Sequence, residues 1–265
     1  MNNGHSGFFL YGGRGRIFCL HHSPAEKSQL IIVAPFAEEM NKSRRMFTLL
    51  ARELRPRGYG VLVPDLYGTG DSEGDFADSR WEIWQQDLAL AARHLRAQGA
   101  RTISLLGLRL GALLALECAC SECVPAKRVV LWQPVVSGNV FMTQFLRLRI
   151  AANMAAATEE TTQSLRQRLA QGEALEVAGY RLAPELASAI DAASMQSISL
   201  PDSLMLHWME IGSAHSPAGR RIMDGWRKSA TVTESLVAGP PFWSTSEITL
   251  APELIEKTVA IFEQG

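Results

Sequence analysis

The sequence predicts an α/β fold: a mostly parallel sheet with helices on both faces and a helical cap inserted late in the chain. Short, continuously apolar segments, typical of buried parallel strands, alternate with segments of helical periodicity. Such alternation implies right-handed crossovers and a sheet covered on both sides. It stops at residue 138 and resumes after residue 200. We therefore expect a core domain of residues 1–137 and 201–265, and a mainly helical cap of residues 138–200.

Each element follows from a local pattern, taken in chain order. Residues 8–11 and 16–21 flank a glycine-rich turn, which predicts an antiparallel hairpin. Apolar strands are expected at residues 30–34, 60–64, 102–106 and 128–132. Between them, helices are expected to end near residue 55, to span about 78–98 and to begin at 111. After the cap, strands are expected at 203–209 and 231–237, and helices at 217–227 and 251–262.

Composition and charge exclude several classes of function. The chain has 265 residues, 47% of them hydrophobic, and a net charge of -1, so no overall charge draws it to nucleic acid or anionic membranes. The first residues lack a secretion-signal pattern, and the longest uncharged run, 129–146, is interrupted by Gln133 and Pro134. We expect a cytoplasmic protein without nucleic-acid partners or stable membrane insertion, and leave protein partners open.

The four cysteines are too few for a disulfide framework in a chain of this length. Three of them stand close together, at Cys118, Cys120 and Cys123. On a helix, Cys118 and Cys120 point about 200° apart, so they cannot share one metal ion. We expect buried or half-buried thiols, with their redox role left open. We expect no metal and no other cofactor.

Residues 103–117, I-S-L-L-G-L-R-L-G-A-L-L-A-L-E, contain the feature on which the functional interpretation depends. A strand pattern ends at Gly107 and a helical pattern begins at Gly111. Small residues two places before and after a turning residue let a strand reverse sharply into a helix, as in the nucleophile elbow G-x-S-x-G. The turning residue here is Arg109. Because an arginine stays protonated, it cannot attack a carbonyl carbon.

Four motifs carry a resemblance to a known family: P-F-A-E-E-M-N-K-S-R-R (35–45), D-L-Y-G-T-G-D-S-E-G-D-F (65–76), G-L-R-L-G-A-L-L-A (107–115) and G-P-P-F-W (239–243). Together with the element order, they resemble the α/β-hydrolase fold along essentially the whole chain. More narrowly, they resemble the exosortase A system-associated hydrolase 2 group. The resemblance implies a bacterial cytoplasmic protein encoded with the machinery of protein sorting (the PEP-CTERM system) and exopolysaccharide export.

The departures from an active α/β hydrolase point to a missing catalytic triad. An active member has a nucleophile at the elbow, an acid after a late strand and a histidine after the last strand. Here the elbow holds Arg109, and Glu210, Ser213 and His215 follow the strand at 203–209. No histidine follows His215, and the last strand leads into G-P-P-F-W. A base that could activate a replacement nucleophile is therefore also missing.

Two interpretations of Arg109 remain open. Its guanidinium offers a fork of donors to a carboxylate or phosphate at a helix N-terminus. Alternatively, it forms an internal ion pair with Glu38 or Glu39, whose loop lies beside the elbow in this fold; the two are compatible if a ligand completes the shell. We expect a positive φ at Arg109. The candidate catalytic residues are Arg109, Glu38 and Glu39; the candidate ligand-binding residues are Arg109, Glu39, Asn41, Trp132, His207 and Trp243.

Three hypotheses about function follow. The first is a degenerate hydrolase, or pseudoenzyme, that binds an anionic small molecule or a partner without turning it over. The second is an active ester or thioester hydrolase in which Glu38 or Glu39 activates water against a carbonyl polarised by Arg109. The third is a structural or interaction subunit whose cap contacts another member of the export system. The missing triad favours the first and third.

Overall fold

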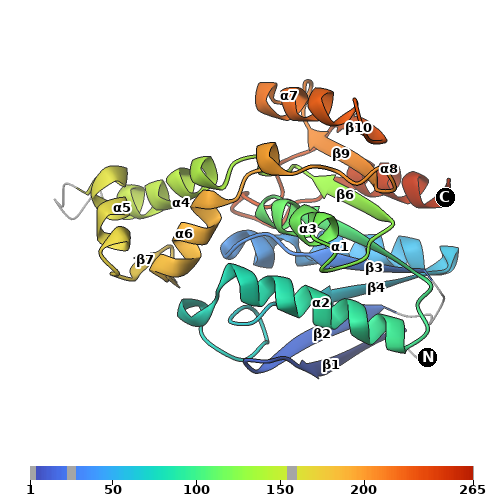
Figure 1. Ribbon diagram of the computed structural model, residues 1–265, viewed down its shortest axis with the longest axis horizontal. Coiled ribbons are helices and arrows are strands. Elements are labelled where there is room, and N and C mark those ends of the chain that lie inside the picture. Colours follow the sequence, from blue (N-terminus) through green and yellow to red (C-terminus); the bar gives the residue numbers. More distant parts are fainter. Residues whose placement is uncertain (1–3, 23–27, 154–159, 265) are drawn as a thin grey trace.

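An eight-stranded sheet forms the centre of the molecule in the computed structural model, which describes residues 4–22, 28–153 and 160–264 (Figure 1). Its strand order is β1-β2-β4-β3-β5-β6-β9-β10. The strands are β1 (His5–Tyr11), β2 (Arg16–His22), β3 (Ser28–Val33), β4 (Tyr59–Pro64), β5 (Thr102–Leu108), β6 (Arg128–Trp132), β9 (Met205–Ile211) and β10 (Val232–Val237). The pairs β1·β2 and β2·β4 are antiparallel, and all other pairs are parallel. The predicted fold class and its four central strands are confirmed.

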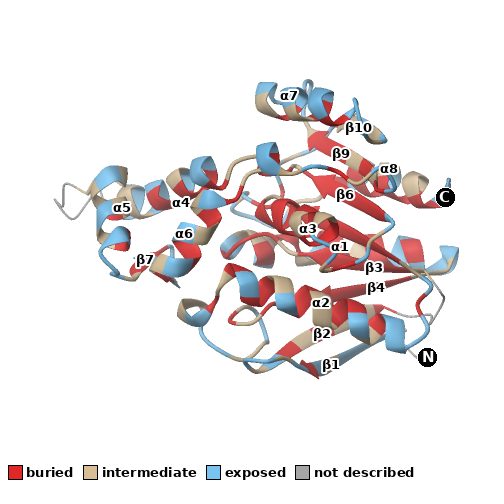
Figure 2. Ribbon diagram, viewed as in Figure 1, coloured by how far each residue is buried: buried red, intermediate tan, exposed pale blue. Residues whose placement is uncertain are grey.

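Helices cover both faces of this sheet. Helices α1 (Glu38–Leu54) and α8 (Pro252–Glu263) pack on one face, and α2 (Trp81–Ala97), α3 (Leu110–Cys120) and α7 (Pro217–Trp226) on the other. Alternate residues of a strand supply the two cores: Leu30 and Ile32 face α1, whereas Ile31 and Val33 face α2 and α3. The central strands are therefore buried along nearly their whole length (Figure 2). Burial on both faces explains why they read as continuous apolar runs.

Several predicted boundaries differ from the structure by up to three residues, and two of them show the cause. The helix predicted from residue 78 begins at Trp81, because Phe76–Asp78 forms a separate 3-10 turn and Ser79 is extended, its hydroxyl donating to Tyr67 O at 3.0 Å. The strand predicted at 203–209 runs from Met205 to Ile211 and is in register with β6 and β10. Neighbouring strands, rather than local sequence, set its ends.

Residues 138–200, which we call the cap, contain α4 (Gly138–Asn153), α5 (Thr162–Ala170), α6 (Pro184–Ala192) and the 3-10 turn Met195–Ser197. They also contain a hairpin, β7 (Leu175–Val177) and β8 (Tyr180–Leu182), although no strand pair was predicted there. Ala178 and Gly179 both have positive φ, at 50° and 83°, as a two-residue hairpin turn requires. In the described part of the cap, no strand joins the central sheet.

The cap rests on the loops that follow the sheet's central strands, away from the two termini (Figure 1). Phe36, in the loop after β3, packs against Phe141 and Phe145 of α4, with ring centroids 5.6 and 5.0 Å away. An ion pair between Arg80 and Glu185, 3.3 Å long, links α6 to the residue before α2. Within the described ranges, no helix combines the length and apolarity needed to span a membrane.

Candidate functional site

A single residue, Arg109, makes the sharp turn between β5 and α3. Its φ and ψ are 56° and -119°, so the predicted positive φ is confirmed. A Cβ on Gly107 would lie 2.4 Å from Ala112 Cα, and one on Gly111 would lie 2.4 Å from Ala34 O. Both glycines are therefore required by close backbone contacts. The Arg109 N–H donates to Trp132 O at 3.0 Å, which fixes the turn against the next strand.

The Arg109 side chain lies between the first turn of α1 and the loop after β10. Its Nε donates to Glu39 Oε1 at 3.3 Å, and its Cζ lies 5.6 Å from the centroid of the Trp243 ring. The predicted glutamate partner is thus Glu39. The pair has one nitrogen-to-oxygen contact, and each side chain is 21% exposed, so it is neither bidentate nor fully buried.

Both members of this ion pair keep unused hydrogen-bonding capacity. Burial raises the pKa of Glu39, an effect that the charge of Arg109 and its hydrogen bond oppose. Glu39 Oε2 is buried without a hydrogen-bond partner among the described residues. In that part of the chain, Nη1 and Nη2 of Arg109 also have no hydrogen-bond partner. The guanidinium can therefore bind a small anion, and Glu39 Oε2 can accept one hydrogen bond from a ligand.

Trp243 stands in the loop where a catalytic histidine was expected. Its contact with Arg109 is of the cation–π type, at 5.6 Å. The late acid and histidine lie elsewhere: Glu210 Oε2 is 2.5 Å from Nδ1 of His215, and Glu210 Oε1 accepts from the Ser216 hydroxyl at 3.1 Å. Ser216 caps α7. This buried acid–histidine pair therefore supports the start of α7.

Glu38 and Asn41 lie one turn apart at the start of α1 and face the cap. Asn41 Nδ2 donates to Glu38 Oε2 at 3.1 Å, and the Tyr180 hydroxyl lies 3.3 Å from the same oxygen. Glu38 and Asn41 are both exposed. The structure therefore brings Arg109, Glu39 and Trp243 together, with Glu38 and Asn41 on the neighbouring turn where the cap meets the core.

The structure does not bring the side chains of two candidate ligand-binding residues, Trp132 and His207, to this site, although the carbonyl of Trp132 accepts from the Arg109 N–H. Trp132 is 0% exposed, and its Nε1 donates to Thr258 Oγ1 at 2.9 Å, so it belongs to the core beneath α8. His207 pairs in register with Val130 and Thr233 inside the sheet, and its Nδ1 is 2.5 Å from Thr233 Oγ1. Burial lowers the pKa of His207 to about 4, with Arg128 adding to the effect.

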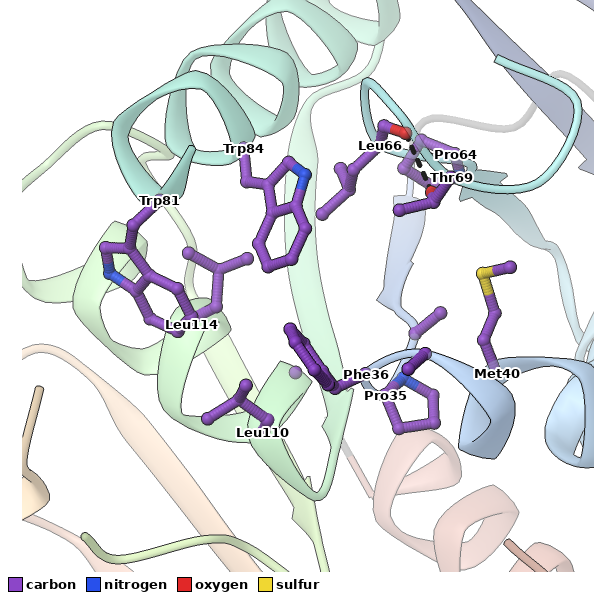
Figure 3. Close-up of a pocket in the computed structure, with 13 residues that line it drawn as sticks. Pro35, Phe36, Met40, Pro64, Leu66, Thr69, Trp81, Trp84, Leu110 and Leu114 are labelled. Atoms are coloured by element: carbon purple, nitrogen blue, oxygen red, sulfur yellow. Dashed lines mark hydrogen bonds between the residues drawn. The ribbon is translucent and has the colours of Figure 1, made fainter. Parts of the chain in front are cut away.

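An apolar cavity lies on the other side of the elbow, and sequence reasoning missed it. Its volume is only about 30 Å³, and Phe36, Trp81, Trp84, Leu110 and Leu114 are prominent in its lining (Figure 3). Thr69 carries the only hydroxyl group among the described lining residues, and this hydroxyl donates to Leu66 O at 2.7 Å. The signal available in the sequence is the pair of tryptophans, Trp81 and Trp84, about one turn apart on α2.

In the described ranges, no group of three or more His, Cys, Asp or Glu residues is placed to hold a metal ion. The expectation that the protein uses no cofactor stays a prediction.

Comparison with known proteins places these features in a family. A family model described as serine aminopeptidase, S33, matches residues 21–196. Among solved structures, Est1E from Butyrivibrio proteoclasticus with bound ferulic acid has a TM-score of 0.68 at 13% identity, covering 97% of this chain and 98% of that one. The thioesterase domain from the curacin biosynthetic pathway has a TM-score of 0.62 at 15% identity, covering 98% and 100%.

The proline iminopeptidase-related protein from Thermus thermophilus has a TM-score of 0.63 at 16% identity, covering 98% of this chain and 96% of that one. At such identities, the similarity establishes the fold. A search among curated proteins gave no match.

Proposed function

The chain belongs to the serine aminopeptidase, S33, family and has the α/β-hydrolase fold, and from that premise we propose that it binds an anionic small molecule at Arg109 without hydrolysing it. One observation carries the proposal. The elbow position is occupied by a guanidinium that stacks on Trp243 and leaves its two terminal nitrogens without a described protein partner.

The residues at the elbow argue for binding over turnover. Acyl transfer in this fold needs a nucleophile and a base that activates it. Arg109 and Trp243 stand where these two groups are expected, and neither can perform its role, because arginine stays protonated and an indole is not a base. A guanidinium at the start of α3 instead suits a carboxylate or phosphate, whose charge the helix dipole also stabilises.

A second candidate function has one specific observation in its favour. Burial raises the pKa of Glu39, and its Oε2 has no described hydrogen-bond partner. A carboxylate with a raised pKa is suited to accept a proton from water. In this alternative, Glu39 activates water against an ester or thioester carbonyl that Arg109 polarises.

The biological setting is a further part of the proposal. The motifs that resemble exosortase A system-associated hydrolase 2 support a role in an exosortase-linked export system, where the ligand or a protein partner would be found. In the third hypothesis, the protein is an interaction subunit. The exposed surface of the cap, rather than Arg109, then makes the functional contact, with another member of the export system. The expected cytoplasmic location stays a prediction.

Calorimetric titration tests the proposal, with inorganic phosphate and ferulate as probes. We expect binding to the parent protein and at least tenfold weaker binding to an Arg109→Gln, Glu39→Gln double variant, which leaves no unpaired charge. Arg45→Gln, an exposed substitution on α1, is the matched control and should bind like the parent. Equal binding by the double variant would overturn the proposal. Hydrolysis of a ferulate ester by the parent, abolished by Glu39→Gln alone, would favour the second candidate.

A further inference from the structure

The end of α3 folds back on itself and brings two cysteines together. Helix α3 ends at Cys120, Glu122 has a φ of 59°, and the N–H of Val124 donates to Cys118 O at 3.0 Å. A hydrogen bond joins the thiols of Cys118 and Cys123. The sequence analysis compared only Cys118 with Cys120, so the approach of Cys123 to Cys118 was not predicted.

The two thiols differ in access to solvent. Cys118 is buried, with 0% of its surface exposed, and Cys123 is half-buried, with its Sγ 3.1 Å from Gln85 O on α2. A small oxidant can therefore reach Cys123, while Cys118 is reached only through its neighbour. Cys120 is half-buried as well, but burial raises its pKa to about 11, and among the described residues no hydrogen bond joins it to either thiol.

We propose that Cys118 and Cys123 form a redox-active dithiol that hydrogen peroxide converts into an intramolecular disulfide. The inference rests on the thiol-to-thiol contact and on the turn that maintains it. It does not depend on the function of Arg109.

The surroundings assign a different role to each thiol. The Cys118 thiol donates to Cys123, and Arg93 and the backbone of Ala89 also stabilise a negative charge there, so the pKa of Cys123 falls to about 7. The same pairing and burial raise the pKa of Cys118 far above its usual range. Because the thiolate is the nucleophilic form, Cys123 reacts with the oxidant first.

The reaction then proceeds in two balanced steps. The Cys123 thiolate attacks one peroxide oxygen, the O–O bond breaks, and a sulfenic acid and a hydroxide ion form. The Cys118 sulfur next attacks the Cys123 sulfur, so that the S–S bond forms, the S–O bond breaks and the hydroxyl group leaves. The proton from Cys118 and one from solvent convert both hydroxide ions into water. The two sulfurs lose two electrons in total, and hydrogen peroxide gains them.

Peptide mapping of the full-length protein tests this. Trypsin cuts after Arg109 and Lys127, which leaves all three cysteines in one peptide, residues 110–127. After peroxide treatment, we expect this peptide to be two hydrogens lighter, with Cys120 as its only alkylatable thiol and full reversal by dithiothreitol. Cys120→Ser should form the same disulfide, whereas Cys123→Ser should not. In Cys118→Ala, the sulfenic acid on Cys123 should persist long enough to react with dimedone.

Two results would overturn the inference. One is a parent peptide that keeps three alkylatable thiols after treatment with peroxide. The other is a disulfide that includes Cys120, or one that is lost in Cys120→Ser. If Cys118→Ala fails to fold, the variants at the half-buried positions, Cys123→Ser and Cys120→Ser, still test the inference. The disulfide should be present in the 110–127 peptide of Cys120→Ser and absent from that of Cys123→Ser.

Discussion

Arg109 holds a backbone conformation that non-glycine residues rarely adopt, and its surroundings show how that conformation is maintained. A φ of 56° at such a residue costs about 1–3 kcal/mol. Hydrogen bonds fix the residue on both sides: its N–H donates to Trp132 O, and its carbonyl accepts from the N–H of Val135 at 3.2 Å. The side chain adds the contacts with Glu39 and Trp243. A serine at this position keeps the strained turn and loses these last two contacts.

Replacing the arginine with the nucleophile of an active hydrolase should therefore not restore activity. We expect Arg109→Ser to show no esterase activity, because Trp243 rather than a histidine stands beside the new hydroxyl. Its free energy of unfolding should fall by about 2 kcal/mol, between the values for exposed and fully buried ion pairs. Urea denaturation and a p-nitrophenyl ester assay measure both quantities. Arg45→Ser is the matched control; saturable esterase activity, or stability equal to the control's, would contradict the expectation.

The local contacts of the elbow could be predicted from the sequence, but the directions of distant side chains could not. Gly107 and Gly111 predicted the turn because steric clash depends only on neighbouring backbone. The sequence could not show where the Trp132 and His207 side chains lie, because the face a strand residue occupies depends on register with strands far away in sequence. Trp132 thus points into the core beneath α8, where Thr258 accepts its N–H.

Among the elements, the loop after β3 joins the cap to the core. Phe36 is 4% exposed and packs against Phe76 and Trp84 of the core region as well as Phe141 and Phe145 of α4. A side chain shared by both parts couples the stability of the cap to that of the core.

Truncating Phe36 should weaken both parts together. We expect Phe36→Ala to lower the free energy of unfolding by about 3–5 kcal/mol, as for other large buried aromatic residues. Hydrogen exchange in α4 should accelerate by a similar factor to exchange in the core. Phe9→Ala, at a position on β1 that is 42% exposed, is the control and should have a small effect. Equal losses in the two variants would refute the coupling.

Within the cap, Glu160 holds three side chains in place. It accepts hydrogen bonds from Arg149 at 2.7 and 2.9 Å, from Arg168 at 2.7 Å and from Asn153 at 3.0 Å. The Arg149 guanidinium is the main cause of the lowering of the Glu160 pKa to about 2. Because the folded-state pKa is depressed, the stabilisation is present above pH 4.5 and is lost as the pH falls towards 2.

Removing this charge should therefore have a pH-dependent effect. We expect Glu160→Gln to lower the melting temperature at pH 7 by roughly 3 °C, the change that about 1 kcal/mol produces in a chain of this size. The difference from the parent should shrink between pH 4.5 and 2. Calorimetry across this range provides the measurement, with Glu176→Gln, an exposed substitution on β7 of the cap, as the control. A difference that stays constant down to pH 2 would exclude the charge as its cause.

At the scale of elements, the sequence predicted the strands and helices whose apolar residues follow a clear pattern. Strands with five or more apolar residues were found within two or three residues of their bounds. The β7–β8 hairpin was missed because three-residue strands are too short for alternation to stand out, and its Ala178-Gly179 turn is not among the strongest hairpin signals. The apolar cavity was missed because its walls come from four separate segments.

For the whole molecule, buried titratable groups make stability depend on pH in two opposing ways. Burial raises the pKa of Asp87 to about 6, and its carboxylate accepts from the N–H of Tyr67 at 2.8 Å. Burial lowers the pKa of His22 to about 4, and His5, His21, Arg52 and Arg55 lower it further. The folded state therefore binds a proton more tightly than the unfolded state at Asp87, and less tightly at His22.

These shifts predict two variants with opposite pH profiles. Asp87's raised pKa gives stability that is present below pH 3.8 and is lost as the pH rises through 6, so Asp87→Asn should gain about 3 kcal/mol over the parent at pH 7 and little at pH 4. The lowered pKa of His22 gives stability that is present above pH 6.5 and is lost as the pH falls through 4. The free energy of unfolding of His22→Gln, relative to that of the parent, should therefore be highest at pH 4.

Both profiles come from urea denaturation at half-unit steps from pH 4 to 7, with His94→Gln, a half-buried substitution on α2, as the control. The difference between Asp87→Asn and the parent should rise with pH, and that between His22→Gln and the parent should fall, so the two curves should have slopes of opposite sign. The contributions of Asp87 and His22 to the parent's stability then oppose each other between about pH 4 and 6. Parallel curves for the two variants would show that neither buried group titrates in this range in the folded protein.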